Sequence, residues 1–236
     1  MVTPPNPIIG IIFGRMDSER LPGKMLLRAN GVPLIGYVIE RAKRIMGVQS
    51  IVLATTGRPT DDELAEYART QGIEVFRGDS EKVLYRGLKC AQQYGAIYFV
   101  RLNGDSPFLD YHLIGQSLGC LQLAQPDLVS NLIGRTFPYG ISVEIIRTET
   151  LRRLLMTEQL DYQDQEHVTR YFYRNRWKFS IHRISSRYPE LSGARLTVDT
   201  EDDFTAFCQI ISELGDDALS SEYGRVARLR LSMNQR

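Results

Sequence analysis

The sequence lacks three features that would decide its class at once: a long hydrophobic run, a paired set of cysteines and a large net charge. No apolar run approaches the roughly 18–20 residues that span a bilayer, so we expect no membrane partner. The three cysteines, Cys90, Cys120 and Cys208, are odd in number and far apart, which excludes a disulfide framework and suits buried residues in a reducing cytoplasm. The net charge of +1 provides no overall field for nucleic acid, so any anion site must be local.

Short β-branched runs alternate with helical stretches along the chain. Strands are expected at 8–12, 50–56, 73–76, 96–102, 127–131, 141–146, 178–184 and 195–199. Helices are expected at 33–46, 61–71, 80–95, 110–124, 162–175 and 200–213, with Ser80 and Asp110 as caps. Because strands separated by helices form mostly parallel sheets, this order predicts one α/β domain over residues 8–214, with helices on both faces. Longer irregular joins around 141–146 and 178–184 indicate a small antiparallel lobe.

The two ends of the chain are expected to lie outside this domain. Residues 1–7 have neither the basic nor the apolar region of a secretory signal, so we expect a disordered lead-in. Residues 215–236 carry four arginines. We expect this C-terminal tail to be solvated or packed against a partner.

The most distinctive segment is FGRMDSERLPGKML, residues 13–26, directly after the first expected strand. It holds three cations, Arg15, Arg20 and Lys24, and two glycines, Gly14 and Gly23, that allow close approach of the backbone to a ligand. Ligands bind beyond the carboxyl ends of strands in open parallel sheets, and such cations can hold a polyphosphate. The pattern is neither a P-loop nor a dinucleotide fingerprint. A solvated surface loop explains the charges equally well.

Seven blocks, in matching order, resemble a known family. The pattern R-x-x-S-x-R-L-P-G-K is similar to the signature of sugar-activating cytidylyltransferases, most closely the spore-coat polysaccharide type and more distantly the 3-deoxy-manno-octulosonate type. The other blocks are LATT (53–56), VFRGDSEKVLYR (75–86), VRLNGDSPFLD (100–110), SN with RTFPYG and VE (130–144), EHVTRYFYRN (166–175) and LTVDTEDDF (196–204). The resemblance covers about residues 8–210 and implies a Rossmann-like fold of the nucleotide-diphospho-sugar transferase type.

The resemblance implies that the bound anion is the triphosphate of CTP. An oxygen of a sugar, sugar acid or phosphorylated small molecule would attack the α-phosphorus and pyrophosphate would leave, in surface polysaccharide or glycoconjugate precursor synthesis. Such a transfer needs positioning, neutralisation of phosphate charge and Mg²⁺. By the resemblance, nucleotide is held by Gly14, Arg15, Ser18, Arg20, Gly23 and Lys24. Lys24, Arg15 and Asp105 are the expected catalytic residues, and relatives suggest a homodimer.

Two acids follow expected strands on the edge that should carry the loop. Asp105 follows the strand at 96–102, and Asp199 closes the strand at 195–199. If both strands run parallel to the first, both carboxylates converge on the loop, and Mg²⁺ commonly takes one or two carboxylates. The resemblance assigns these two positions to catalytic magnesium. A helix-cap role is the alternative for Asp199.

The remaining assignments concern the base and the acceptor. Thr55 and Arg77 are the candidates for reading cytosine, although Arg77 pairing with Asp79 is an alternative. The resemblance places four positions at the acceptor, Asn131, Arg135, Gly140 and Glu144, and Glu144 is able to orient or deprotonate its hydroxyl. It also places Glu166 and His167 beside the acceptor or at a subunit contact, with core packing as the alternative.

The chain departs from the family pattern at six positions, beginning with Phe13 and Gly14, where the family usually has Gln and Ala. Asp17 and Glu19 stand where the family usually has Gly and Thr, and Tyr139 and Ser142 where it generally has Asp. The two loop acids either face solvent, or pair with Arg15 and Arg20 or with a metal, or mark weakened catalysis. We favour an enzyme with an altered acceptor. The rivals are a non-catalytic nucleotide-binding homologue and a glycosyltransferase of similar fold.

Overall fold

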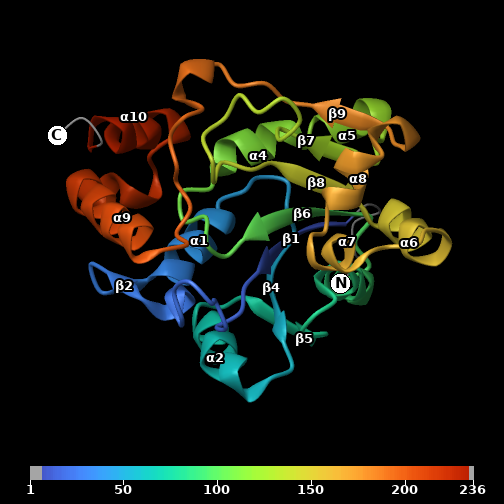
Figure 1. The fold of residues 1–236 in the computed structure, drawn as a ribbon, viewed down its shortest axis with the longest axis horizontal. Coiled ribbons are helices and arrows are strands. Elements are labelled where there is room, and N and C mark those ends of the chain that lie inside the picture. Colours follow the sequence, from blue (N-terminus) through green and yellow to red (C-terminus); the bar gives the residue numbers. More distant parts are fainter. Residues whose placement is uncertain (1–6, 234–236) are drawn as a thin grey trace.

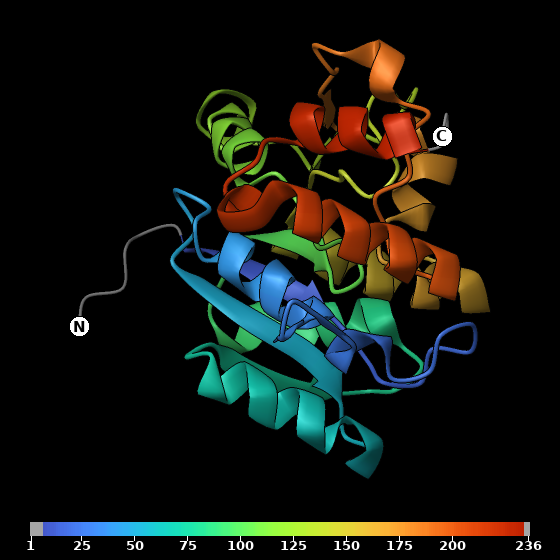
Figure 2. The same cartoon turned by 90° about the vertical axis from the view of Figure 1, so that its left-hand side faces the viewer.

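A seven-stranded sheet with helices on both faces forms the centre of the computed structural model, which describes residues 7–233 (Figures 1 and 2). Its strand order is β5-β4-β1-β6-β8-β7-β9. The strands are β1 (Ile8–Phe13), β4 (Ser50–Thr56), β5 (Glu74–Gly78), β6 (Tyr98–Asn103), β7 (Leu128–Ser130), β8 (Glu144–Arg147) and β9 (Ile181–Arg183). The pairs from β5 to β6 are parallel, and β8 is antiparallel to both of its neighbours. The predicted fold class is confirmed.

The strands expected in an antiparallel lobe belong instead to this sheet, where β9 pairs in parallel with β7. A separate two-stranded antiparallel hairpin is formed by β2 (Arg28–Ala29) and β3 (Val32–Pro33). The prediction of a strand at 195–199 is wrong. In this segment Arg195 alone pairs, through an isolated bridge to Tyr139.

Ten α-helices connect and cover these strands in the described part of the chain. They are α1 (Leu34–Ala42), α2 (Asp62–Thr70), α3 (Val83–Gln93), α4 (Tyr111–Ser117), α5 (Cys120–Ala124), α6 (Thr148–Thr157), α7 (Tyr162–Glu166), α8 (Arg170–Arg174), α9 (Glu201–Leu214) and α10 (Tyr223–Met233). The helix expected at 110–124 is therefore interrupted at 118–119, and the one expected at 162–175 at 167–169. A 3-10 turn, η1 (Lys24–Leu26), ends the opening loop.

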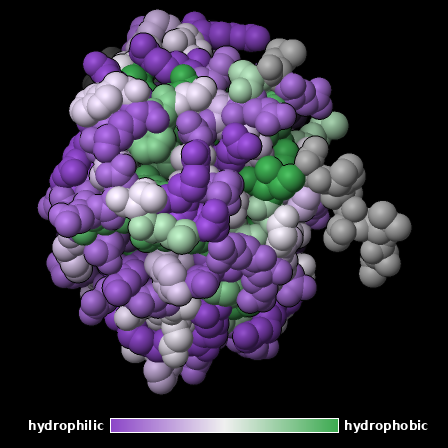
Figure 3. Space-filling model, turned by 90° about the vertical axis from the view of Figure 1, so that its right-hand side faces the viewer, coloured by the Kyte–Doolittle hydropathy of each residue, from purple (hydrophilic) through white to green (hydrophobic). Residues whose placement is uncertain are grey.

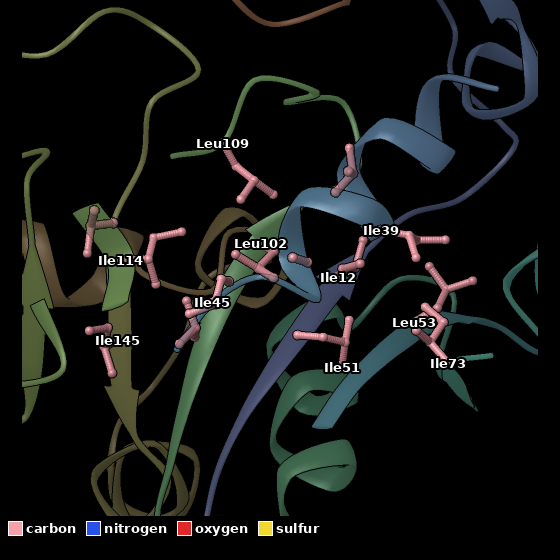
Figure 4. Close-up of a cluster of buried hydrophobic side chains, with 14 of the residues drawn as sticks. Ile12, Ile39, Ile45, Ile51, Leu53, Ile73, Leu102, Leu109, Ile114 and Ile145 are labelled. Carbon is pink, nitrogen blue, oxygen red and sulfur yellow. The ribbon is translucent and has the colours of Figure 1, made fainter. Parts of the chain in front are cut away.

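Alternate residues of the strands build a core on each face of the sheet. Ile12 faces the side covered by α1, α2 and α4, where Ile39 and Ile114 pack toward it and its neighbours (Figure 4). Ile9 and Ile11 face the other side, against α3, α6 and α8. This alternation follows from the two-residue repeat of a strand. The same alternation places Arg101 and Asn103 of β6 on the face of the sheet that α3 covers, because Phe99, two residues earlier, packs on that face.

A third core cluster joins the two C-terminal helices to α1. Figure 2 shows α9 and α10 stacked beyond α1, and Val226 and Ala227 of α10 are fully buried there. The core thus continues past residue 214, where we expected a boundary before a tail. Of the expected lead-in, residues 1–6 lie outside the described residues.

The helix caps agree only in part with expectation. Asp110 caps α4 by accepting a hydrogen bond from the Leu113 amide. Ser80 does not cap α3; Asp79 accepts the amides of Glu81 and Lys82 instead. Thr200, not Asp199, caps α9.

The surface gives no indication of a membrane-spanning element. Within residues 7–233 no helix combines the length and hydrophobicity that a span requires. The face on the right of Figure 1 is mostly hydrophilic, with apolar groups in small separate patches (Figure 3).

Candidate active site

An open cleft of about 830 Å³ lies beyond the carboxyl ends of β1 and β6. It brings together nine of the residues predicted from the sequence: Gly14, Arg15, Ser18, Arg20, Lys24, Asp105, Glu166, His167 and Asp199. It does not bring in Gly23, Thr55, Arg77, Asn131, Arg135, Gly140 or Glu144. Among the lining residues that the sequence reasoning did not assign are Arg58, Ser80, Arg86, Arg101, Asn103 and Tyr162.

Positive and negative charges balance along the cleft wall. The cations are Arg15, Arg20, Lys24, Arg58, Arg86 and Arg101, and the acids are Asp17, Glu19, Glu81, Asp105, Glu166 and Asp199. A polyanion therefore meets local pairs rather than a uniformly positive surface. Neutralising a triphosphate in this cleft requires an additional cation or a rearrangement of these pairs.

Lys24 connects the two carboxylates that were predicted to bind metal. Its Nζ donates to Asp105 Oδ2 at 3.2 Å, to Asp199 Oδ1 at 2.9 Å and to the Val198 carbonyl at 2.8 Å. The lysine side chain is only 7% exposed, so these bonds form largely out of water. Backbone pairing brings the distant segments together, because the Val198 amide donates to the Asp105 carbonyl. The predicted convergence thus occurs without the predicted strand.

Asp199 is surrounded by cations on both carboxylate oxygens. Besides Lys24, Arg20 lies 3.4 Å from Oδ1 and Arg195 lies 2.5 Å from Oδ2. Burial alone would raise the pKa of Asp199, but the hydrogen bond and charge of Lys24, together with the two arginines, lower it. The carboxylate is consequently held in its charged form.

Two acids, Asp17 within the opening loop and Asp61 before α2, hold this loop in place. Asp17 bridges Arg15 at 3.1 Å and Arg58 at 2.6 Å, which supports the pairing explanation for this residue. Buried Asp61 accepts the Met16 amide at 2.7 Å and fixes the loop to the segment before α2. Exposed Glu19 has no ion pair with the described residues.

Gly23 is left-handed, with a φ of 70°, and its amide donates to the Met16 carbonyl. It therefore shapes the turn that delivers Lys24, although it does not line the cleft.

Arg15 also reaches across the cleft. Its Nη2 lies 3.5 Å from Glu166 Oε1, at the end of α7. His167 follows α7 and lines the same wall. The structure therefore places the predicted Glu166 and His167 opposite the opening loop.

The residues expected to read cytosine lie outside the cleft wall. Thr55 is fully buried, and its hydroxyl has no partner among the described residues. Arg77 donates to the Thr56 and Arg58 carbonyls and pairs with Asp62, so the suggested pair with Asp79 is wrong.

Arg86 of α3 is a lining residue that the sequence reasoning missed. It is 2% exposed, and its Nη1 donates to the Asp79 carbonyl at 2.5 Å. Burial and the nearby charge of Arg15 lower its pKa to about 10. Every other cation of the cleft wall is within ion-pair distance of a carboxylate, whereas Arg86 has none among residues 7–233. A charged residue inside the apolar helical stripe of VLYRGL was the sequence signal for this site.

Glu144 does not line the cleft. It is fully buried on β8, and its two oxygens accept hydrogen bonds from Arg101 and, at 2.6 Å, from the Tyr173 hydroxyl. Burial opposes the charged form, but the charge of Arg101 and the hydrogen bonds from Thr169, Tyr173 and Arg101 together outweigh it and lower the pKa of Glu144. A direct role of Glu144 at an acceptor hydroxyl stays a prediction, and both of its oxygens are engaged within the protein in this arrangement. Glu144 positions Arg101, which lines the cleft beside Asn103.

Three other predicted acceptor residues shape a neighbouring loop. Asn131 bridges the Ile141 carbonyl and the Val143 amide with its side-chain amide. Gly140 has a φ of 103°, and a Cβ there would meet the Leu196 backbone at 2.8 Å. Arg135 is exposed and stacks on Tyr139, whose ring also contacts Arg195.

The Asp105 and Asp199 carboxylates fit a divalent cation. Both present an oxygen within 3.2 Å of one ammonium nitrogen, and hard oxygen donors suit Mg²⁺. Within the described residues, no group of three or more acidic, His or Cys side chains forms a complete metal site. Phosphate oxygens and water would therefore have to complete the coordination. A cation-bearing loop after β1 and two carboxylates that meet one lysine at the same edge of a mostly parallel sheet are the arrangement expected of a nucleotidyltransferase site.

Comparison with known proteins identifies the family. The family model described as Cytidylyltransferase matches residues 9–233. Spore coat polysaccharide biosynthesis protein SpsF of Bacillus subtilis is 31% identical over 226 residues, which cover 92% of each chain. This chain belongs to the cytidylyltransferase family, a family of CTP-dependent nucleotidyltransferases.

Solved structures agree with this fold. A cytidylyltransferase from Leptospira borgpetersenii superposes with a TM-score of 0.90 at 27% identity, covering 98% of this chain and 96% of that chain. CMP:2-keto-3-deoxy-manno-octonic acid synthetase complexed with CTP gives 0.68 at 16% identity, covering 88% and 99%.

Proposed function

We propose that this protein transfers CMP from CTP to an oxygen of a sugar, sugar acid or phosphorylated small molecule and releases pyrophosphate. The observation that carries the proposal is the meeting of Lys24 with Asp105 and Asp199 beside the opening loop. Phosphoryl and nucleotidyl transfer depend mainly on positioning and charge neutralisation, which this cluster is suited to provide. The known cytidylyltransferase family supports CTP as the donor.

The residues of the cleft divide between the two substrates. Arg15, Arg20 and Lys24 would contact the phosphates, and Asp105 and Asp199 would hold Mg²⁺, which supplies positive charge to the triphosphate. Arg86 would add a buried charge that has no ion pair with the described residues on the nucleotide side, near Arg15.

The acceptor would bind at the other end of the cleft. Arg101 and Asn103 follow one face of β6 toward Asp105, and Glu166 and His167 line the opposite wall. These groups offer hydrogen bonds to hydroxyl or acidic oxygens. The setting we propose is precursor synthesis for a surface polysaccharide or another glycoconjugate, as the name of SpsF indicates for that relative.

The test is pyrophosphate release from CTP, ATP, GTP and UTP with Mg²⁺ and a panel of sugars, sugar acids and sugar phosphates. Release with CTP and one acceptor, and its loss in Lys24→Ala, is the expected result. Glu19→Gln is the matched control, because Glu19 lines the same cleft without an ion pair to the described residues. Tight CTP binding without release across the panel would favour a non-catalytic homologue.

A homodimer stays a prediction from the resemblance. Light scattering on the purified protein would give the mass directly, against 26.9 kDa for one chain. A mass of one chain at assay concentration would contradict it.

A further inference from the structure

Lys24 is the most heavily engaged cation in the cleft. An ammonium group has three protons to donate, and the three acceptors of Lys24 are Asp105, Asp199 and the Val198 carbonyl. Its donor capacity is therefore fully used within the protein. In this arrangement no proton remains for a phosphate oxygen.

The same ammonium occupies the position that a metal bridging the two carboxylates would take. It lies 3.2 Å from Asp105 Oδ2 and 2.9 Å from Asp199 Oδ1. A divalent cation placed between these oxygens would be strongly repelled by the lysine charge at such short range. Lys24 and the metal therefore compete for one pair of carboxylates.

We propose that Lys24 holds the metal site closed in the ligand-free protein and is exchanged for the divalent cation. Asp105 and Asp199 would hold the cation, and the Lys24 ammonium, no longer bound to them, would be free to donate to the phosphates. The proposal rests on the proposed function only for the assignment of a metal to these two acids. It makes Lys24 a positioning residue for the metal as well as a phosphate ligand.

The two carboxylates differ in how accessible they are. The Asp105 side chain is 29% exposed, and among the described residues it forms hydrogen bonds with Lys24 and the Ser106 hydroxyl. Asp199 is 11% exposed and is contacted by Arg20 and Arg195 as well as Lys24. Asp105 is therefore the carboxylate more accessible to a hydrated cation. Asp199 would become available to it only on loss of its contact with Lys24.

The decisive measurement is Mn²⁺ binding to the protein without nucleotide, followed by electron paramagnetic resonance. We expect weak binding to the wild type and at least about tenfold tighter binding to Lys24→Met, which keeps the aliphatic stem but removes the competing charge. Asp105→Asn in the Lys24→Met background should remove the gain. Equal or weaker Mn²⁺ binding by Lys24→Met would overturn the proposal.

Arg20→Met is the matched control. Arg20 also contacts Asp199, but its side chain is 66% exposed and it has no contact with Asp105. We expect its loss to change Mn²⁺ affinity by less than about threefold, because an exposed cation is screened by solvent. A gain in Arg20→Met as large as that in Lys24→Met would refute the special role of Lys24.

A measurement on the wild type keeps the proposal testable if Lys24→Met does not fold. In protein labelled with ¹⁵N-lysine, the Lys24 ammonium signal is the one that disappears in Lys24→Arg. We expect Mg²⁺ alone, at saturating concentration, to shift this signal. An unchanged signal in the metal-saturated protein would overturn the exchange.

These results separate the inference from the proposed function. Tighter Mn²⁺ binding by Lys24→Met in a protein that never releases pyrophosphate would uphold the exchange and reject the enzyme. Pyrophosphate release without the gain in Mn²⁺ affinity would uphold the enzyme and reject the exchange.

Discussion

Two ion-pair clusters meet at β6 and its following loop, and they differ in how much water reaches them. In the first, Lys24 joins Asp105 and Asp199 at the wall of the cleft. In the second, Arg101 pairs with Glu144, which is fully buried and has both oxygens engaged. The chemistry is similar, but the carboxylates differ in exposure, because the Asp105 side chain is 29% exposed and that of Glu144 is 0% exposed.

The difference indicates separate roles for the two clusters. A buried carboxylate with saturated oxygens fixes its cation, because losing either partner leaves an uncompensated charge. A partly exposed carboxylate can exchange a lysine for another cation at lower cost. The closed cluster should therefore govern stability, and the open one ligand binding and catalysis.

Replacing Asp105 with Asn tests the open cluster and should have the largest effect. The change removes a charge that we assign to the metal while keeping the shape of the side chain. We expect pyrophosphate release to fall by at least about 10²–10³-fold, with little change in unfolding. Steady-state kinetics at saturating CTP would measure this loss. Activity within tenfold of wild type would remove Asp105 from the catalytic centre.

Replacing Glu144 with Gln tests the closed cluster. It leaves the Arg101 charge buried without its partner, and we expect the free energy of unfolding to drop by about 3–5 kcal/mol. Urea denaturation would measure it. Glu149→Gln, which breaks an exposed pair with Arg152, should leave the urea midpoint unchanged. Equal midpoints for the two variants would mean that burial does not distinguish the clusters.

Replacing Arg86 with Met sharpens the comparison with a cation that belongs to neither cluster. Burial lowers its pKa to about 10, so its charge is unfavourable in the free protein. We expect CTP affinity to fall about tenfold, or ~1.4 kcal/mol, with no loss of unfolding free energy. Calorimetry and urea denaturation would give the two values. Unchanged affinity would assign Arg86 to structure alone.

Replacing Asp17 with Asn should have the smallest effect. Asp17 pairs with Arg15 and Arg58 in a partly exposed position, where such pairs contribute about 0.5 kcal/mol. Freeing the two arginines should tighten CTP binding by about two- to threefold at low salt, and the gain should shrink at high salt. Weaker CTP binding by Asp17→Asn would instead mean that Asp17 helps to orient the loop.

Much of the fold could be read from local patterns. The strands at 50–56 and 98–103 follow from β-branched runs, and the opening loop follows from its glycines and cations. The segment 195–199 was misread because an apolar, β-branched stretch looks like a strand whether or not it pairs along its length. It instead lies beside Tyr139 and Asp105 through an isolated bridge and a few backbone hydrogen bonds. The burial of Glu144 could not be predicted from the sequence either. Acids are seldom buried without a partner, and the partner of Glu144, Arg101, lies 43 residues away along the chain.

The sequence by itself determined the α/β order of elements, the anion loop after β1, and the presence of Lys24, Asp105 and Asp199 in family blocks. These are local properties of short segments, set by hydrophobic period, turn residues and motif spacing. Only the tertiary structure decided which charges are already paired. Lys24 and Asp199 are 175 residues apart along the chain yet share a hydrogen bond. Their pairing depends on how the sheet, the opening loop and the segment before α9 pack together, and no local pattern encodes that distance.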